Sequence, residues 1–336
     1  MCAAMSSPKV SIIIPVYKVE KYIGSCAKSL FNQSLSGIEF VFIDDCSPDH
    51  SMEKLNRVIE EYSAKITENH WIVRVERMPK NSGQAEVRKY AISIASGDYI
   101  IHCDSDDWIE PNMINEMWNL AHKDELDVVV CDYSHIKKTE TVIHKGMVNP
   151  LCNRDEFFEE IVSIFSSWSL CNKLIRRKLY SENTILFPQT GMNVGEDMAL
   201  VTQLLYYSKS VGYIGKPFYN YIDNRESISN KHNVSGVIDN YVQWIANICL
   251  LESFFKDKDI YDRMNKKLSY GVVFATDEAL TRLESTGKSM YLLIARLCVR
   301  LLRSNEVSSF GKRRVIRYMK RMFSSSLKNK IHQLRA

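Results

Sequence analysis

Short apolar runs alternate with amphipathic stretches over the first 130 residues of the chain. The runs are rich in Val, Ile and Phe and predict strands over 10–16, 39–43, 71–76 and 99–103. Between them, apolar residues at helical spacing predict helices over 20–33, 48–65 and 81–95. A further helix is expected over 111–122, and then a strand over 127–131. This alternation predicts a mostly parallel α/β sheet flanked by helices, with right-handed connections.

Local signals predict where some of these helices begin. Ser47 directly precedes Pro48, so we expect Ser47 to cap a helix that has Pro48 at its first position. Residues 81–83, Asn-Ser-Gly, are expected to open the next helix.

The regular alternation ends near residue 150. One more helix is predicted over 198–208, and the aromatic and polar residues 218–229 are expected to form a mobile loop. From about residue 234 the pattern is helical to the end of the chain. We therefore expect an α/β domain over 8–232 and a helical C-terminal region over 233–336.

The composition is that of a globular protein, with 336 residues, 45% of them hydrophobic and 25% charged. The nine cysteines form no CxxC pair, a pattern that favours reduced thiols and a cytoplasmic protein. The first residues lack the pattern of a signal peptide. No uncharged apolar run reaches the roughly 18 to 20 residues that a membrane-spanning helix needs.

The basic charge is concentrated at the C-terminal end. Nine of the 44 Lys and Arg residues lie within 312–336, which contains no acid, so the remaining 35 are outnumbered by 40 acidic residues. Residues 312–323 have the pattern of a basic amphipathic helix, which suits peripheral contact with an anionic membrane. A solvated final helix packed on the body is the alternative. No aromatic-interleaved basic surface supports nucleic-acid binding.

Acidic residues follow two of the predicted strands. Asp44 and Asp45 end one of them, and Asp104, Asp106 and Asp107 end another. Since ligands of open α/β sheets bind outside the carboxyl ends of the strands, these acids are expected at one edge. Carboxylates suit Mg²⁺ or Mn²⁺, whereas the alternative is a solvated acidic turn. The chain has neither GxGxxG after its first strand nor GxxxxGK[ST], which argues against dinucleotide and P-loop sites.

A further acidic pair, Glu196 and Asp197, precedes the helix expected over 198–208. Acids at this position are often explained by the helix dipole alone, which stabilises them by about 0.3 to 1 kcal/mol. Lys173 lies in a basic stretch, where surface charge is the simplest interpretation and contact with a phosphate or an acceptor is the alternative.

Six ordered segments over about 10–229 resemble the inverting family 2 glycosyltransferases of the GT-A fold, of the bacterial polysaccharide and glycolipid type. The segments are VSIIIPVYKVEKYI, FVFIDDCSPD, NSGQAEVRKYAISIASGDYIIHCDSDD, LCNKLIRRKLY, GED and PFYNYIDNRESIS. The resemblance implies that 8–132 binds a nucleotide-sugar and that 133–232 lies on the acceptor side. It also implies a divalent metal, Mn²⁺ or Mg²⁺.

The resemblance assigns roles to particular residues. Asp106 and Asp104 would hold the metal, and Asp197 would be the catalytic base. The donor nucleotide would be contacted by Pro15, Tyr17, Asp44, Asp45, Arg88, Asp104 and Arg225. Two positions depart from the family pattern: Cys46 replaces a usual Gly, and Lys89 replaces a usual Asn. These departures affect the fine geometry of the donor site.

The function implied is transfer of one sugar from a nucleotide-sugar to a hydroxyl acceptor, with inversion at the anomeric carbon. A UDP-sugar is the favoured donor, and a saccharide or lipid-linked saccharide of cell-surface polysaccharide assembly the expected acceptor. Two alternatives stay open. A sugar-phosphate nucleotidyltransferase would share an acidic metal site, although the chain lacks a Gly-rich basic loop after the first strand. A catalytically inactive nucleotide-sugar-binding module is the other.

Overall fold

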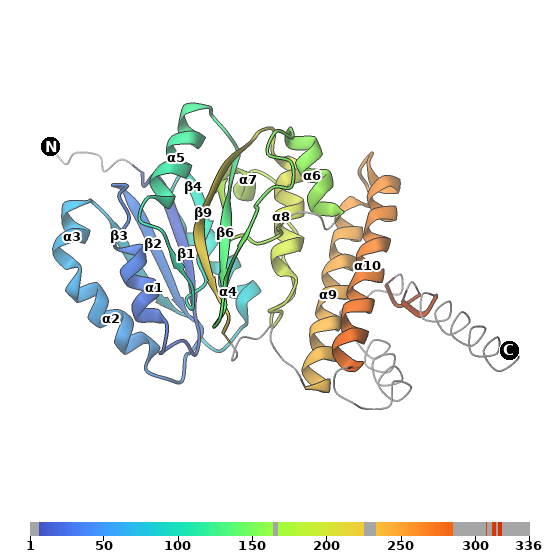
Figure 1. Ribbon diagram of the computed structural model, residues 1–336, viewed down its shortest axis with the longest axis horizontal. Coiled ribbons are helices and arrows are strands. Elements are labelled where there is room, and N and C mark those ends of the chain that lie inside the picture. The colour runs from blue at the N-terminus through green and yellow to red at the C-terminus, as the bar shows by residue number, and fades with distance from the viewer. Residues whose placement is uncertain are drawn as a thin grey trace, which may run out of the picture. The chain divides into compact units, whose positions relative to one another are not determined.

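The computed structural model describes residues 7–163, 167–224, 233–284, 307, 311–313 and 315–317. The chain divides into two compact units, residues 1–225 and 226–336 (Figure 1). This division falls close to the boundary expected after residue 232. The assignment of 8–132 to a donor half and of 133–232 to an acceptor half stays a prediction.

The N-terminal unit is built on one sheet of nine strands. The strands are β1 (Val10–Val16), β2 (Ile38–Asp44), β3 (Ile72–Arg77), β4 (Tyr99–His102), β5 (Trp108–Ile109), β6 (Val128–Ile136), β7 (Thr141–His144), β8 (Lys173–Arg176) and β9 (Val211–Ile222). Their order is β3-β2-β1-β4-β8-β6-β9-β5, and β7 pairs with β6. The five strands predicted from the apolar runs all form.

The sheet is mixed, and its two halves differ. Strands β3, β2, β1 and β4 pair in parallel, as the alternation predicted. β8 is antiparallel to both β4 and β6, β7 is antiparallel to β6, and β5 is antiparallel to β9. β5, β7 and β8 have two to four residues each, which is too short for a period to be read from sequence.

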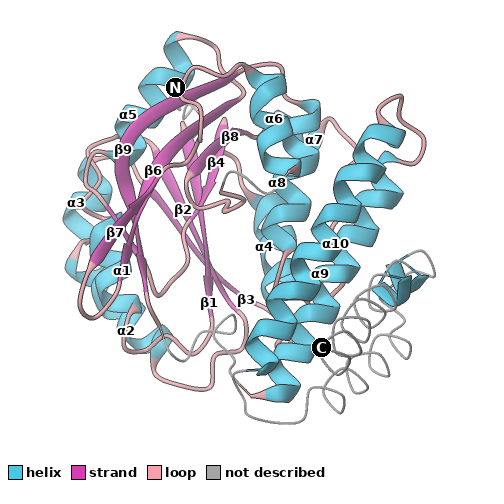
Figure 2. Ribbon diagram, turned by 45° about the vertical axis from the view of Figure 1, so that its right-hand side comes forward, coloured by secondary structure: helices cyan, strands magenta, loops and turns pink. Residues whose placement is uncertain are grey.

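Helices cover both faces of the sheet. They are α1 (Ile23–Leu30), α2 (Ser51–Glu61), α3 (Ser63–Glu68), α4 (Gln84–Ile94), α5 (Met113–Lys123), α6 (Arg154–Val162), α7 (Lys178–Ser181) and α8 (Glu196–Tyr207). Figure 2 shows α1, α2, α3 and α5 on one face and α4, α6, α7 and α8 on the other. Residues of β1, β2 and β4 are buried on both faces as a result, which explains why their sequences are mostly apolar.

The expected start of α2 is wrong. The helix begins at Ser51 rather than at Pro48, with His50 in the N-cap position. The Ser47 hydroxyl instead donates to Asp49 Oδ1 (2.7 Å), and its backbone N–H donates to Asp44 Oδ1 (2.7 Å). Ser47 therefore stabilises the turn after β2, because Asp44 accepts a hydrogen bond from its backbone N–H and Asp49 accepts one from its hydroxyl. The predicted helix is also divided at Tyr62 into α2 and α3.

The loop expected over 218–229 is wrong in its first part. Residues 218–222 complete β9, the longest strand, which pairs in parallel with β6 through an irregular register. Aromatic residues favour strands, and Phe218, Tyr219 and Asn220 are all buried in β9. Residues 225–229 lie outside the described part of the chain.

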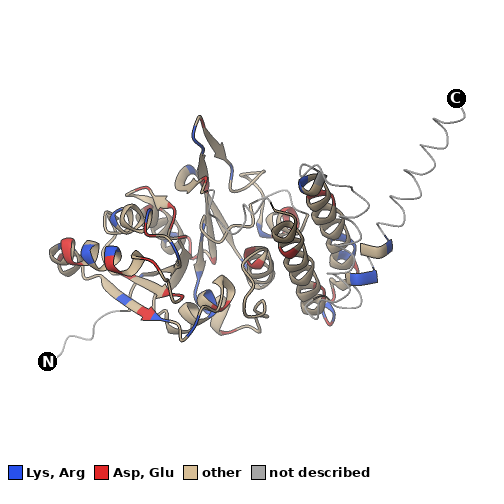
Figure 3. Cartoon of the chain, turned by 90° about the horizontal axis from the view of Figure 1, so that it is seen from below, with Lys and Arg blue, Asp and Glu red and all other residues tan. Residues whose placement is uncertain are grey.

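The C-terminal unit contains two long helices, α9 (Val234–Phe255) and α10 (Tyr261–Glu284). Asn233 caps α9 by accepting a hydrogen bond from Gly236 N (2.8 Å). Within the described residues, no helix is both long and apolar enough to cross a membrane. Figure 3 shows acidic and basic residues interspersed along the described chain. Of the amphipathic helix expected over 312–323, residues 312, 313 and 315–317 are described and are helical, and the rest of 312–336 lies outside the described residues.

Candidate active site

The acids that follow β2 and β4 lie at one edge of the sheet. Both strands pair in parallel with β1, so their carboxyl ends point the same way. The first turn of α4 connects the two groups of acids. Asp45 accepts hydrogen bonds from Ser82 N (2.7 Å) and Gly83 N (2.9 Å), while Gln84 Nε2 donates to Asp104 Oδ1 (3.0 Å). The two groups of acids thus lie at one edge of the sheet and are linked through residues 82–84.

Asp44 and Asp45 are both nearly fully buried. Burial raises the pKa of Asp45, although the two backbone N–H groups that it accepts oppose this change. The next residue, Cys46, has φ = +58°, in the left-handed region that glycine adopts most readily. Cys46 therefore takes the backbone conformation of the glycine that it replaces, and its thiol donates to Met78 O (3.0 Å).

Gly83 allows the start of α4 to approach the segment before α8. Its φ is +82°, and an added Cβ would lie 2.9 Å from Gly191 Cα. In the same segment, Asn193 Oδ1 accepts a hydrogen bond from Gln84 N (2.8 Å). This close packing of two backbones places Glu196 and Asp197, at the start of α8, beside α4.

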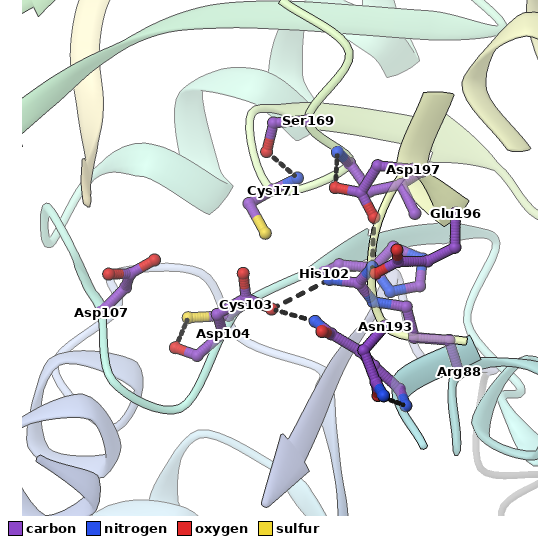
Figure 4. A network of polar contacts seen from close by, with 12 residues as sticks. Arg88, His102, Cys103, Asp104, Asp107, Ser169, Cys171, Asn193, Glu196 and Asp197 are labelled. Atoms are coloured by element: carbon purple, nitrogen blue, oxygen red, sulfur yellow. Dashed lines mark hydrogen bonds and ion pairs between the residues drawn. The ribbon is translucent and has the colours of Figure 1, made fainter. Parts of the chain in front are cut away.

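Arg88 joins Asp104, which follows β4, to the acids of α8 (Figure 4). Its side chain on α4 is only 1% exposed. Nη2 donates to Asp104 Oδ1 (2.9 Å), and Nη1 donates to Glu196 Oε1 (2.9 Å) and to Asp197 Oδ1. One guanidinium thus balances three carboxylates. The expected contact between Arg88 and the donor nucleotide stays a prediction.

The carboxyl groups around Arg88 are harder to ionise than free ones. Burial raises the pKa of Asp104 and of Asp197, and the guanidinium opposes both increases. Burial together with the charge of Asp197 raises the pKa of Glu196 to about 7. Asp197 remains 24% exposed, so it can meet an incoming hydroxyl group, whereas Glu196 is 6% exposed.

The other two acids of the DSDD segment are held by β9 and the residues after it. Asp107 accepts from Tyr219 OH (2.5 Å) and from Ile222 N (2.8 Å). The Tyr219 hydroxyl also accepts from Asp104 N (3.1 Å). Asp106 accepts from Asn224 Nδ2 (2.9 Å). Asp107 thus supports the turn, while Asp104 and Asp106 are the partly exposed pair.

This pair of carboxylates fits a metal that is held jointly with a ligand. Among the described residues, no group of three or more His, Cys, Asp and Glu side chains could hold an ion. Mg²⁺ is commonly bound through one or two carboxylates, with substrate phosphates and water completing the shell. Asp104 and Asp106 offer the two carboxylates that such a shared site requires.

The remaining predicted donor residues divide into two groups. Pro15 is the last residue but one of β1 and pairs with Ile43, and Tyr17 directly follows the strand, so both lie at the acidic edge and are half-buried. Arg225 lies outside the described residues.

Several residues of the site were not predicted. They are Gln84, the backbone N–H of Leu170, Asn193 and Tyr219. Lys173 was expected at the surface and is fully buried instead. For one of these residues the sequence contained a usable signal. Tyr219 lies in an aromatic stretch, and such stretches favour strands.

Solved structures share this fold. The chain superposes on Staphylococcus aureus TarS 1–349 in complex with UDP-GlcNAc with a TM-score of 0.63 at 21% identity, covering 79% of this chain and 71% of TarS. It also matches the Pyrobaculum calidifontis mannosyltransferase PcManGT in complex with GDP-Man and Mn²⁺, with a TM-score of 0.53 at 13% identity, covering 93% and 86% of the two chains. The expected GT-A type of fold is confirmed.

Residues 11–184 match the model of glycosyl transferase family 2, and the chain belongs to that family. It is 32% identical over 236 residues to the putative glycosyltransferase EpsH of Bacillus subtilis, covering 68% of this chain and 64% of EpsH. It is 28% identical over 221 residues to the poly(ribitol-phosphate) beta-glucosyltransferase of Bacillus spizizenii, covering 65% of this chain and 33% of that relative. The chain thus spans between about a third and two thirds of these relatives.

Proposed function

We propose that this chain is a metal-dependent inverting glycosyltransferase that moves one sugar from a nucleotide-sugar to a hydroxyl acceptor. The favoured donor is a UDP-sugar, as in the TarS complex. The acceptor proposed is a saccharide or lipid-linked saccharide of cell-surface polysaccharide assembly. One observation carries the proposal: Arg88 holds Asp104 and Asp197 on either side of one guanidinium.

In this proposal Asp197 is the general base. An acceptor hydroxyl is a poor nucleophile until a positioned group accepts its proton. Two hydrogen bonds orient the carboxylate, one from Arg88 and one from Leu170 N (3.1 Å). Since a carboxylate has about four lone-pair sites, sites remain for the proton of the acceptor. Direct attack by the hydroxyl on the anomeric carbon then inverts its configuration.

On the donor side, Asp104 and Asp106 would hold the divalent metal together with the diphosphate. When bound, the metal supplies positive charge to the leaving diphosphate. Pro15, Tyr17, Asp44 and Asp45 lie at the same edge and are proposed to form the nucleotide pocket. The buried Asp45 carboxylate also accepts hydrogen bonds from Ser82 N and Gly83 N at the start of α4. Because Arg88 lies on the same helix, donor binding and the position of Arg88 are linked through α4.

Replacing Asp106 with Ala is expected to weaken Mn²⁺-dependent binding of UDP by at least about tenfold, because one of two metal carboxylates is lost. Calorimetric titration of UDP in the presence of Mn²⁺ measures the effect, and EDTA should weaken binding to the wild-type protein in the same way. Asp124→Ala, which removes an exposed acid at the end of α5, is the matched control and should bind normally.

Unchanged UDP affinity in Asp106→Ala would contradict the metal assignment. Binding of UDP and Mn²⁺ without release of UDP from any UDP-, GDP- or dTDP-sugar, with water or saccharide acceptors, would favour an inactive binding module. A thermal-shift screen of these donors with Mn²⁺ shows which nucleobase of the donor the protein prefers.

The basic segment 312–336 is proposed to bring a cytoplasmic enzyme to an anionic membrane surface, where lipid-linked acceptors lie. Sedimentation with vesicles of anionic lipid, for the full chain and for a chain ending at residue 311, tests this idea. Equal sedimentation of the two would contradict it.

A further inference from the structure

Lys173, the first residue of β8, is fully buried next to the active site. Its ammonium group donates three hydrogen bonds, to Ser167 O (2.6 Å), Ser169 O (2.9 Å) and Asn172 Oδ1 (2.8 Å). An ammonium group has three protons, so all of them are used within the protein. Lys173 in this position has no proton left for a phosphate or a sugar, and its role must be exerted through its partners.

All three partners belong to one loop, residues 167–172. The end of the loop is joined to β6, since Asn172 Nδ2 donates to Cys131 O (2.8 Å) and Cys131 N donates to Asn172 O (3.0 Å). Lys173 N also donates to Leu170 O (3.2 Å). The buried ammonium group therefore holds three carbonyl oxygens of the loop by hydrogen bonds, and its removal would leave these oxygens without this donor.

The same loop contacts the proposed base directly. Leu170 N donates to Asp197 Oδ2 (3.1 Å), and Figure 4 shows this loop beside Asp197. Together with Arg88, this N–H group orients the carboxylate. A backbone N–H has no freedom apart from the conformation of its loop, so the orientation of Asp197 depends on what holds residues 167–172.

The charge of Lys173 acts on Asp197 as well. Burial lowers the pKa of Lys173 to about 7, and the negative charge of Asp197 opposes this decrease. In return, the Leu170 N–H group and the Lys173 charge both oppose the increase in the pKa of Asp197. Loss of Lys173 should therefore raise the pKa of Asp197 further.

We propose that Lys173 is a positioning residue for sugar transfer, which holds the 167–172 loop and thereby keeps the Asp197 carboxylate oriented. The inference rests on the proposed role of Asp197 as the base. A purely structural Lys173 would change stability, but it would leave the pH dependence of transfer unchanged.

Lys173→Met keeps the aliphatic stem and removes the charge and the three donors. Release of UDP from UDP-GlcNAc with Mn²⁺ is expected to show a kcat about 10- to 100-fold lower, because the base is misplaced. The acid limb of the pH–kcat profile should move to higher pH. The Kd for UDP should stay unchanged. Lys178→Met is the matched control, because the side chain of Lys178 on α7 is 70% exposed, and it should behave like the wild type.

A double-mutant cycle separates the two roles. In an Asp197→Asn background, Lys173→Met is expected to have no further effect on the residual rate, since it acts through Asp197. A loss of the same size in both backgrounds, or an unshifted acid limb, would overturn the role of Lys173 alone. Full activity of Asp197→Asn by itself would instead overturn the proposed function. If Lys173→Met is insoluble, Lys173→Gln, which keeps two N–H donors, serves in the same cycle.

Discussion

Replacing Asp197 with Asn is expected to lower kcat for sugar transfer by about 10²- to 10⁴-fold, while binding of UDP and Mn²⁺ stays unchanged. The amide oxygen can still accept from Arg88 or from Leu170 N, so the local structure should persist. What is lost is the group that accepts the proton of the acceptor. Because donor binding does not need that group, the effect should appear in kcat.

The pH dependence gives a second measurement of the same prediction. Burial raises the pKa of Asp197 above its ordinary value of 3.8. A base acts in its ionised form, so the wild-type rate should fall as the pH falls through this raised pKa. Asp197→Asn should lose this dependence.

Asp155→Asn is the matched control for the base. Asp155 lies on α6 with its side chain 80% exposed, and its replacement should change neither kcat nor donor binding. Unimpaired transfer by Asp197→Asn would refute the assignment of the base. A loss of UDP binding equal to the loss of transfer would show that Asp197 serves donor binding rather than proton transfer.

Replacing Arg88 with Met is expected to reduce the free energy of unfolding by about 3–5 kcal/mol and to abolish transfer. The variant leaves Asp104, Glu196 and Asp197 close together without the buried cation that balances them. Arg88→Lys should restore only part of the stability, because one ammonium group cannot reproduce the forked geometry of a guanidinium. Urea unfolding followed by circular dichroism measures both.

The free energy of unfolding that Arg88→Met loses should be greater at pH 8 than at pH 5. Without the guanidinium, the pKa values of the three carboxyl groups in the folded state rise further. A carboxyl whose pKa is raised by folding binds more protons in the folded than in the unfolded state, so stability falls as the pH rises above its unfolded value. Lowering the pH protonates the group and relieves the penalty.

Arg57→Met is the matched control for Arg88. Arg57 is 73% exposed and pairs with Glu53 one turn away on α2, so its loss should cost less than about 1 kcal/mol. Wild-type stability of Arg88→Met at pH 8 would mean that the three carboxyl groups do not depend on the guanidinium. Such a result would remove the link between the two sides of the site.

Much of the parallel half of the sheet could be predicted, because its strands and helices are long enough to show their period. The VSIIIPV run of β1 is buried on both faces, and the acids after β2 and β4 lie where parallel strands bring them. In the other half of the sheet only β6 could be predicted. β5, β7 and β8 have too few residues, and the aromatic residues of β9 resembled a loop.

The sequence by itself determined that carboxylates end two strands of a parallel sheet and that another acidic pair begins a later helix. These are local facts, since strand direction and the positions of acids along a strand follow from residues close together in the chain. Only the tertiary structure decided what these acids contact. Arg88 and Glu196 are 108 positions apart, and no local pattern records their ion pair.

The same reason explains Lys173. A lysine in a basic stretch reads as surface charge, because sequence does not show which carbonyl groups will surround it. Packing of the 167–172 loop supplies three acceptors and places a carboxylate nearby, which makes burial of the charge tolerable. Most chemical groups of the site could be predicted from the sequence, whereas their positions relative to one another are set by the tertiary structure.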